Sequence, residues 1–217
     1  MRITRTMIAT AAVATGISLI VAMPAGAHNN APARTPTTKV LTNAVAVPFN
    51  LEVSNGKLLV ADGAGSVGQV NADGTVSTVV AGVAGASGVA ASADGRYLAY
   101  TTTTGGGGPN VPITASGLFI TGPNGYQASA DTLAFEQANN PDQKVRYGVR
   151  NPSQCVVDEL AKTPLPVAYT GKVDSHAYSV AAYGNRWVVA DAGANALFWV
   201  SRSGDVSTLA VLPSQPA

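Results

Sequence analysis

The chain alternates short apolar runs with turns rich in Gly, Asn and Asp. Within residues 49–80 this pattern predicts four strands, at 49–53, 57–61, 66–70 and 75–80. Valine is frequent in these runs and favours strands. The Asn-Gly and Asp-Gly pairs between them supply the positive φ angles of tight hairpin turns. The segment therefore predicts one antiparallel four-stranded meander.

The same plan returns later in the chain. Residues 187–208 (WVVADAGANALFWVSRSGDVST) are similar to residues 58–78 (LLVADGAGSVGQVNADGTVST). Asp62 and Asp191 align at the ends of the second strands, and self-similarity of this kind indicates repeated structural units. The second meander is predicted from four strands, at 177–182, 186–190, 196–200 and 205–211. A further unit is expected over 87–130, interrupted by a Gly- and Pro-rich loop at 103–114.

Residues 131–163 break the strand pattern. Asp131 is a suitable N-cap for one helix. A second helix is predicted with Asn151 as its N-cap, Pro152 in the first position and Gln154 completing a capping box. We expect a mostly helical insertion between two units, packed across one face of the sheets.

Repeated four-stranded units with matching turns indicate an all-β protein built as a β-propeller. A β-sandwich also uses many short strands and is the alternative. The match of entire units, turn for turn, favours the propeller. The sequence has room for about three such blades, at 49–80, 87–130 and 177–211.

The N-terminus is typical of a secretory signal peptide, assigned to residues 1–27. Arg2 and Arg5 precede an apolar stretch, and Ala25-Gly26-Ala27 forms a small-residue cleavage site. A membrane anchor is the alternative, but the apolar run is short and rich in Ala, Gly and Thr. Residues 28–38 are expected to be a disordered leader, and residues 39–217 the folded domain. We therefore expect a secreted protein, extracellular or in the cell envelope, without a stable membrane span after cleavage.

Charge and cysteine content exclude several functions. The 13 Lys and Arg nearly balance the 12 Asp and Glu, with no basic cluster for nucleic acid. Cys155 is the only cysteine, so no internal disulfide forms. It is interpreted as a small buried hydrophobe, with an intermolecular disulfide or a reactive thiol as alternatives. The only histidines are His28 and His176, too few for a conventional zinc motif.

Four oxygen-bearing residues are candidate metal ligands: Asp62, Asp191, Glu52 and Asn50. Carboxylate and amide oxygens suit calcium or magnesium. A structural role is favoured, because Asp commonly accepts hydrogen bonds from the backbone of a following turn. The repeated position of the two aspartates also argues for a part in building each unit, and the third unit carries Thr101 where the aspartate is expected. No cofactor is therefore expected, except a divalent cation under the alternative. His176 could act as a general base, but a lone histidine without an accompanying nucleophile is weak evidence for a catalytic site.

The repeated segments resemble NHL repeats and, more specifically, the ScyD/ScyE family of secreted NHL-like propellers. The similar stretches are 58–78, 131–142 (DTLAFEQANNPD) and 173–213, within a resemblance that covers nearly all of residues 39–217. This resemblance implies a six-bladed propeller and export, and it supplies no catalytic residues. Because only about three blades are present, we interpret the chain as a truncated form or fragment.

The sequence supports three hypotheses about function. The first is a non-catalytic exported module that binds a protein, a glycan or a small molecule. The second is a metal-dependent, lactonase-like hydrolase. The third is a truncated product without function. Fold alone does not choose among them.

Overall fold

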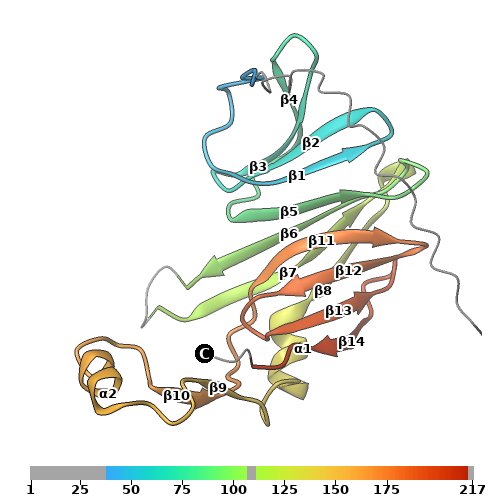
Figure 1. Cartoon of the computed structure of the whole chain (residues 1–217). Coiled ribbons are helices and arrows are strands. Elements are labelled where there is room, and N and C mark those ends of the chain that lie inside the picture. The colour runs from blue at the N-terminus through green and yellow to red at the C-terminus, as the bar shows by residue number, and fades with distance from the viewer. Residues whose placement is uncertain (1–37, 107–110, 215–217) are drawn as a thin grey trace, which may run out of the picture. The chain divides into compact units, whose positions relative to one another are not determined.

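The computed structural model describes residues 38–106 and 111–214, which consist mainly of β-strands (Figure 1). Residues 39–217 form one structural unit by themselves. The predicted signal peptide and all but the last residue of the predicted leader lie outside the described residues. In the described part of the chain, no helix is long and apolar enough to cross a membrane.

Three four-stranded antiparallel meanders make up the fold, each with its strands in chain order. Sheet 1 contains β1 (Pro48–Ser54), β2 (Lys57–Asp62), β3 (Ser66–Val70) and β4 (Val76–Ala81). Sheet 2 contains β5 (Ala86–Ala91), β6 (Leu98–Gly105), β7 (Ile113–Thr121) and β8 (Gln127–Asp131), with the short 3-10 helix η1 (Pro123–Gly125) before β8. Sheet 3 contains β11 (Ala177–Tyr183), β12 (Arg186–Asp191), β13 (Ala196–Val200) and β14 (Val206–Val211). The three predicted meanders are therefore confirmed, with most strand ends within one or two residues; β6 and β7 are longer toward the loop between them.

The three sheets share a β-bulge in their first strands. The pairing between the first and second strands shifts register at Phe49, at Ser87 and at Tyr178. This common register aligns the sheets residue by residue. It places Thr102, not the predicted Thr101, at the position equivalent to Asp62 and Asp191. The sequence alignment was one residue out because sheet 2 lacks the aspartate that marks this point.

Sheet 2 lies between the other two sheets. Its strand β5 contacts both β1 and β11, so the first strands lie side by side. One apolar cluster joins sheets 1 and 2 through Leu59, Val67 and Tyr100. A second cluster joins sheets 2 and 3 through Leu118 and Phe198. The fold is thus all-β with successive packed sheets, and the described sheets do not close on themselves.

The insertion begins with the expected helix. Helix α1 (Thr132–Asn139) follows its N-cap Asp131, whose carboxylate accepts a hydrogen bond from the N–H of Ala134 at 2.8 Å. Helix α2 (Gln154–Leu160) is capped by Ser153. The prediction of Asn151 as that cap is wrong, because Asn151 has a φ of 49°, whereas an N-cap requires extended backbone.

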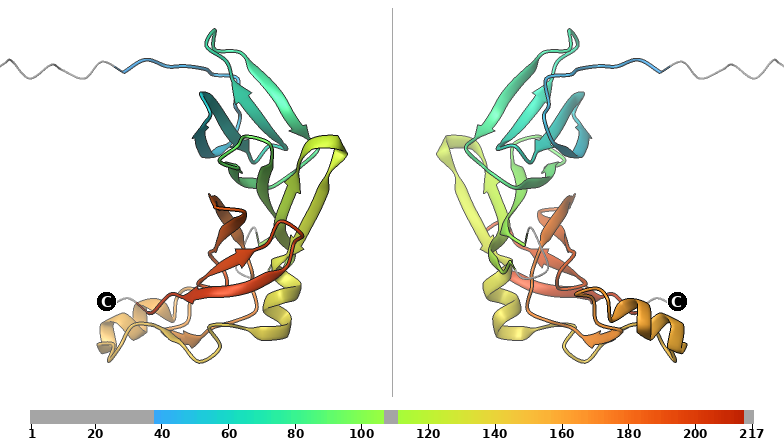
Figure 2. Two further views of the ribbon diagram at one scale, coloured as in Figure 1. Left: turned by 90° about the vertical axis from the view of Figure 1, so that its right-hand side faces the viewer. Right: turned by 90° about the vertical axis from the view of Figure 1, so that its left-hand side faces the viewer.

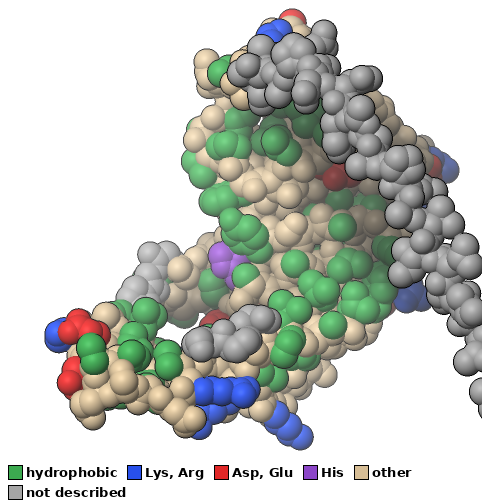
Figure 3. Space-filling view, in the orientation of Figure 1, with side chains coloured by type: hydrophobic (Ala, Val, Ile, Leu, Met, Phe, Trp, Pro, Cys, Tyr) green, Lys and Arg blue, Asp and Glu red, His purple; other side chains and the backbone are tan. Residues whose placement is uncertain are grey.

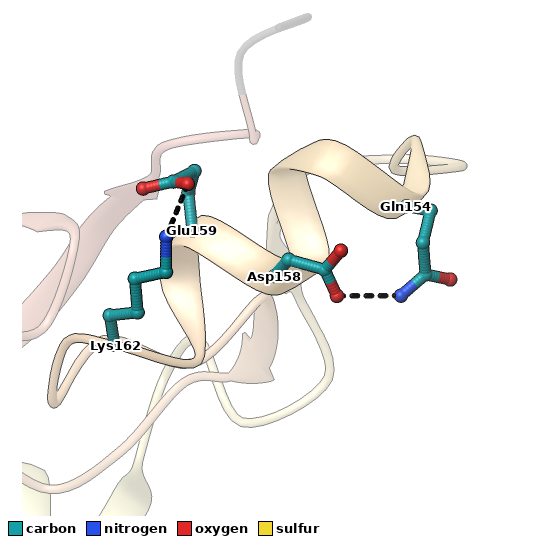
Figure 4. Close-up of polar contacts among 4 residues, drawn as sticks. All are labelled: Gln154, Asp158, Glu159 and Lys162. Atoms are coloured by element: carbon teal, nitrogen blue, oxygen red, sulfur yellow. Dashed lines mark hydrogen bonds and ion pairs between the residues drawn. The ribbon is translucent and has the colours of Figure 1, made fainter.

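The second half of the insertion is less helical and less buried than expected. Strands β9 (Arg146–Gly148) and β10 (Ala168–Thr170) pair with each other, and α2 has no buried residue. Figure 2 shows this segment extending away from the three sheets. Its polar side chains bond to one another, with Gln154 donating to Asp158 and Lys162 paired with Glu159 (Figure 4). Cys155 on α2 is exposed, so its interpretation as a buried hydrophobe is wrong.

Candidate functional site

Asp62 binds the backbone of the segment that leads into sheet 1. Its carboxylate accepts hydrogen bonds from the N–H groups of Ala46, Val47 and Ala64, at 3.1, 2.9 and 3.0 Å. Burial acts to raise the pKa of Asp62, but these backbone donors hold it below its ordinary value. Asp62 therefore joins the segment before β1 to the turn after β2.

Asp191 makes the equivalent connection in sheet 3 and accepts one more hydrogen bond than Asp62 does. Its Oδ1 accepts from the N–H groups of His176, Gly193 and Ala194, at 2.7, 3.2 and 3.0 Å. Its Oδ2 accepts from the hydroxyl of Ser175 at 2.6 Å. The side chain is buried, and both of its oxygens already have protein donors. These contacts support the structural role favoured for both aspartates.

The other two predicted ligands lie on β1. Asn50 accepts a hydrogen bond from the N–H of Val89 on β5 at 3.2 Å, which joins sheets 1 and 2. Glu52 is half-buried two residues later. Among residues 38–106 and 111–214, no group of three or more His, Cys, Asp or Glu side chains is placed to hold a metal ion. The metal site therefore stays a prediction, to be tested by cation binding.

The structure reveals buried polar residues that sequence reasoning missed. Glu136 on α1 is fully buried and accepts a hydrogen bond from the N–H of Ser175 at 2.6 Å. Asp142 is equally buried and accepts from Asn195 at 2.9 Å. The signal in the sequence was the spacing of Thr132 and Glu136, because residues four apart lie on the same face of a helix, here the inward face of α1. These contacts fasten the insertion to the entry of sheet 3.

Burial changes the chemistry of Glu136. Desolvation, followed by the nearby Asp191 and Asp174 carboxylates, raises its pKa to about 7, against the lowering effect of the Ser175 N–H. Its Oε1 atom has no hydrogen-bond partner within the described residues. A protonated carboxyl is therefore the form that this site favours up to neutral pH.

A row of aromatic rings lies at the starts of β1 and β11. The rings of Phe49 and Tyr178 are 6.0 Å apart, centroid to centroid, and those of Tyr178 and His176 are 5.6 Å apart. Phe49 and Tyr178 are the bulged residues of sheets 1 and 3, and they remain 47% and 42% exposed. The shared bulge therefore brings two rings from different sheets together at the surface. We call Phe49, Tyr178 and His176 the aromatic row.

A cleft of about 790 Å³ adjoins this row. It combines apolar, cationic and anionic side chains and is lined by Gly106, Val111, Pro112, Ile113, Lys172, Val173, Asp174, His176, Ala192 and Gly193. We call it the His176 cleft. Partial desolvation and the carboxylates of Asp142 and Asp191 raise the pKa of Asp174, which Lys172 partly offsets. The cleft therefore presents hydrogen-bonding groups of both charges beside exposed aromatic rings.

A scan against models of known protein families gives no match to this chain, and a search of curated proteins finds none similar to it.

Proposed function

We propose that this chain is an exported, propeller-type binding module that holds a glycan in the His176 cleft. The propeller assignment is supported by three equivalent four-stranded sheets whose first strands lie side by side. The likeness of the repeats to ScyD/ScyE proteins supports both the propeller and export.

The aromatic row is the observation that carries the binding function. Aromatic side chains offer large apolar area at little cost in entropy, and those left exposed beside a cleft are suited to ligand contact. A sugar ring can lay its apolar C–H face against Tyr178 and direct its hydroxyls to Asp174 and Lys172. The volume of the cleft lies within the range of small-ligand sites, about 300 to 1,000 Å³.

The hydrogen bonding of the buried carboxylates favours binding over catalysis. Asp62 and Asp191 are occupied by backbone donors, so neither is presented to a substrate. His176 donates its backbone N–H to Asp191, and its ring contacts Tyr178. The lactonase-like alternative needs a divalent cation bound by oxygens such as those of Asp62 or Asp191. Calorimetric titration with calcium or zinc tests it directly, and stoichiometric binding lost in a folded Asp191→Ala variant would favour the hydrolase.

The glycan proposal is tested by ligand-detected NMR with a panel of mono- and oligosaccharides. Tyr178→Ala should weaken binding of any hit about ten-fold or more, as loss of a central aromatic contact does. Tyr183→Ala is the matched control, because Tyr183 is an exposed tyrosine at the far end of the same strand, β11, and its ring contacts Trp199, which does not line the cleft. Binding that survives Tyr178→Ala, or the absence of any hit, would contradict the proposal.

A further inference from the structure

Each sheet has two apolar faces with different partners. In sheets 2 and 3 the leading face is the one turned toward the preceding sheet, and in sheet 1 it is the equivalent face. Its members are Leu51, Val53, Leu58 and Val60 in sheet 1, Val89, Ala91, Leu98 and Tyr100 in sheet 2, and Val180, Ala182, Trp187 and Val189 in sheet 3. The trailing face is the opposite one, and its members are Leu59, Ala61 and Val67 in sheet 1, Ala99, Thr101 and Leu118 in sheet 2, and Val188, Ala190 and Leu197 in sheet 3. The common bulge register makes these sets equivalent position by position.

The two internal interfaces are built alike. In each, the trailing face of one sheet packs on the leading face of the next: Leu59 and Val67 with Val89 in the first, Ala99 and Leu118 with Val180 in the second. One kind of sheet-to-sheet contact therefore occurs twice in the described chain.

Two faces of these same kinds have no described sheet packed on them, although Val60 on the leading face of sheet 1 is itself buried. On the leading face of sheet 1, Leu51 is 61% exposed, whereas its equivalents Val89 and Val180 are 0% and 6% exposed. On the trailing face of sheet 3, Val188 and Leu197 are half-buried, whereas their equivalents in sheet 1, Leu59 and Val67, are buried. Hydrophobic side chains gather over β11–β13 in the view of Figure 3. Contiguous apolar surface of this kind marks an interaction site.

We propose that these two open faces are the halves of one interface, and that a second copy of this chain fills it head to tail. The leading face of sheet 1 in one copy packs on the trailing face of sheet 3 in the other, repeating the contact made twice inside each chain. Two such contacts, related by a twofold axis, leave neither face open. The equivalent faces can make this contact whatever ligand occupies the His176 cleft.

The test is analytical ultracentrifugation of the full chain with single substitutions. Leu51→Glu places a charge on one face and Val188→Glu on the other, at positions whose equivalents are buried in the internal interfaces. Each should convert a dimer to a monomer, weakening association by about ten-fold or more, since an unpaired charge is costly in an apolar interface. Leu165→Glu is the control, because Leu165 is also exposed but lies outside the three sheets, and it should leave the dimer intact.

Mixing the two variants distinguishes this interface from others. The Leu51→Glu copy keeps its trailing face, and the Val188→Glu copy keeps its leading face, so the mixture should form a heterodimer through one intact contact. A wild-type monomer, or a mixture no more associated than its components, would overturn the proposal. Circular dichroism of each variant checks folding. Val53→Glu, on the same leading face, serves if Leu51→Glu does not fold, and Leu197→Glu, on the same trailing face, serves if Val188→Glu does not fold.

Discussion

Sheets 1 and 3 share their register, their two bulges and most of their turns, and yet their interiors differ. Phe198 of sheet 3 occupies the position of Gly68 in sheet 1. Phe198 is buried against sheet 2 and contacts Phe135 of α1, with ring centroids 5.2 Å apart. At Gly68 an added Cβ would meet Val76 at 2.6 Å. In sheet 1, Val76 of the neighbouring strand β4 therefore fills the space beside Gly68, whereas in sheet 3 the large Phe198 side chain reaches out to sheet 2 and α1.

The two aspartates show the same difference. Both accept hydrogen bonds from the turn behind them, but Asp191 also binds Ser175, which connects it to α1. Asp62 has no such link to the insertion. A repeated residue therefore keeps its local role, while its surroundings decide how much of the fold depends on it.

The largest expected effect is at Phe198. Phe198→Ala should lower the free energy of unfolding by about 4 kcal/mol, because it leaves a cavity between sheet 3, sheet 2 and α1. Urea denaturation followed by circular dichroism measures the change. Phe119→Ala is the control, since Phe119 is partly exposed and should cost clearly less. Equal losses would show that sheet 3 is no better packed than the open surfaces.

The aspartates should rank next. Asp191→Ala is expected to cost about 3 kcal/mol, because four donors lose their acceptor, and two of them, Ser175 and Ala194, are fully buried. Asp62→Ala loses three partly buried donors and should cost about 1 to 2 kcal/mol. Both are measured in urea at neutral pH, with Asp158→Ala on exposed α2 as a neutral control. A larger loss at Asp62 would reverse the comparison.

We expect Glu136 to make the free energy of unfolding depend on pH between 4.5 and about 7, an effect that has no counterpart in sheet 1. Its pKa rises from 4.5 to about 7 on folding, so the native state keeps a proton that the unfolded chain releases between these values. The stability it contributes is complete below pH 4.5 and falls as the pH rises toward 7. Glu136→Gln removes this loss and should gain about 2 kcal/mol on wild type between about pH 4.5 and 8.

Thermal or urea unfolding across that pH range measures the difference between the two proteins. Glu159→Gln, on the exposed surface of α2, is the matched control and should show no such trend. A wild-type profile parallel to that of Glu136→Gln would mean that Glu136 is ionised in the folded state.

The smallest effect lies in the first turns of the two sheets. In sheet 1, Asn55 and Gly56 both have positive φ, at 50° and 72°. In sheet 3 only Gly184 does, at 58°, and Asn185 does not. Asn55→Ala should therefore cost about 0.5 to 1 kcal/mol, since alanine tolerates the left-handed region poorly, while Asn185→Ala should be nearly neutral. Similar costs for both would contradict the difference in turn type.

Strand positions were predictable because they depend on local pattern. The Asn-Gly, Asp-Gly and Ser-Gly turns and the apolar runs between them specify the hairpins, and Asp131 caps α1 as expected. The cap of α2 was missed, because Asn, Pro and Ser in succession offer several starts and only the backbone of Asn151 excludes the first. The aromatic row was also missed as a unit. Nothing in a linear sequence says that Phe49 and Tyr178, at the equivalent bulges of two sheets, meet.

By itself, the sequence determined the all-β class, the three meanders and the backbone-binding role favoured for Asp62 and Asp191, because these follow from turns and spacing within a few residues. The tertiary structure decided which faces are buried, which carboxyl is held protonated and where exposed rings meet. Such properties depend on neighbours distant in the chain: Glu136 is buried where it accepts a hydrogen bond from Ser175, and Leu51 is exposed because no described sheet packs on its face.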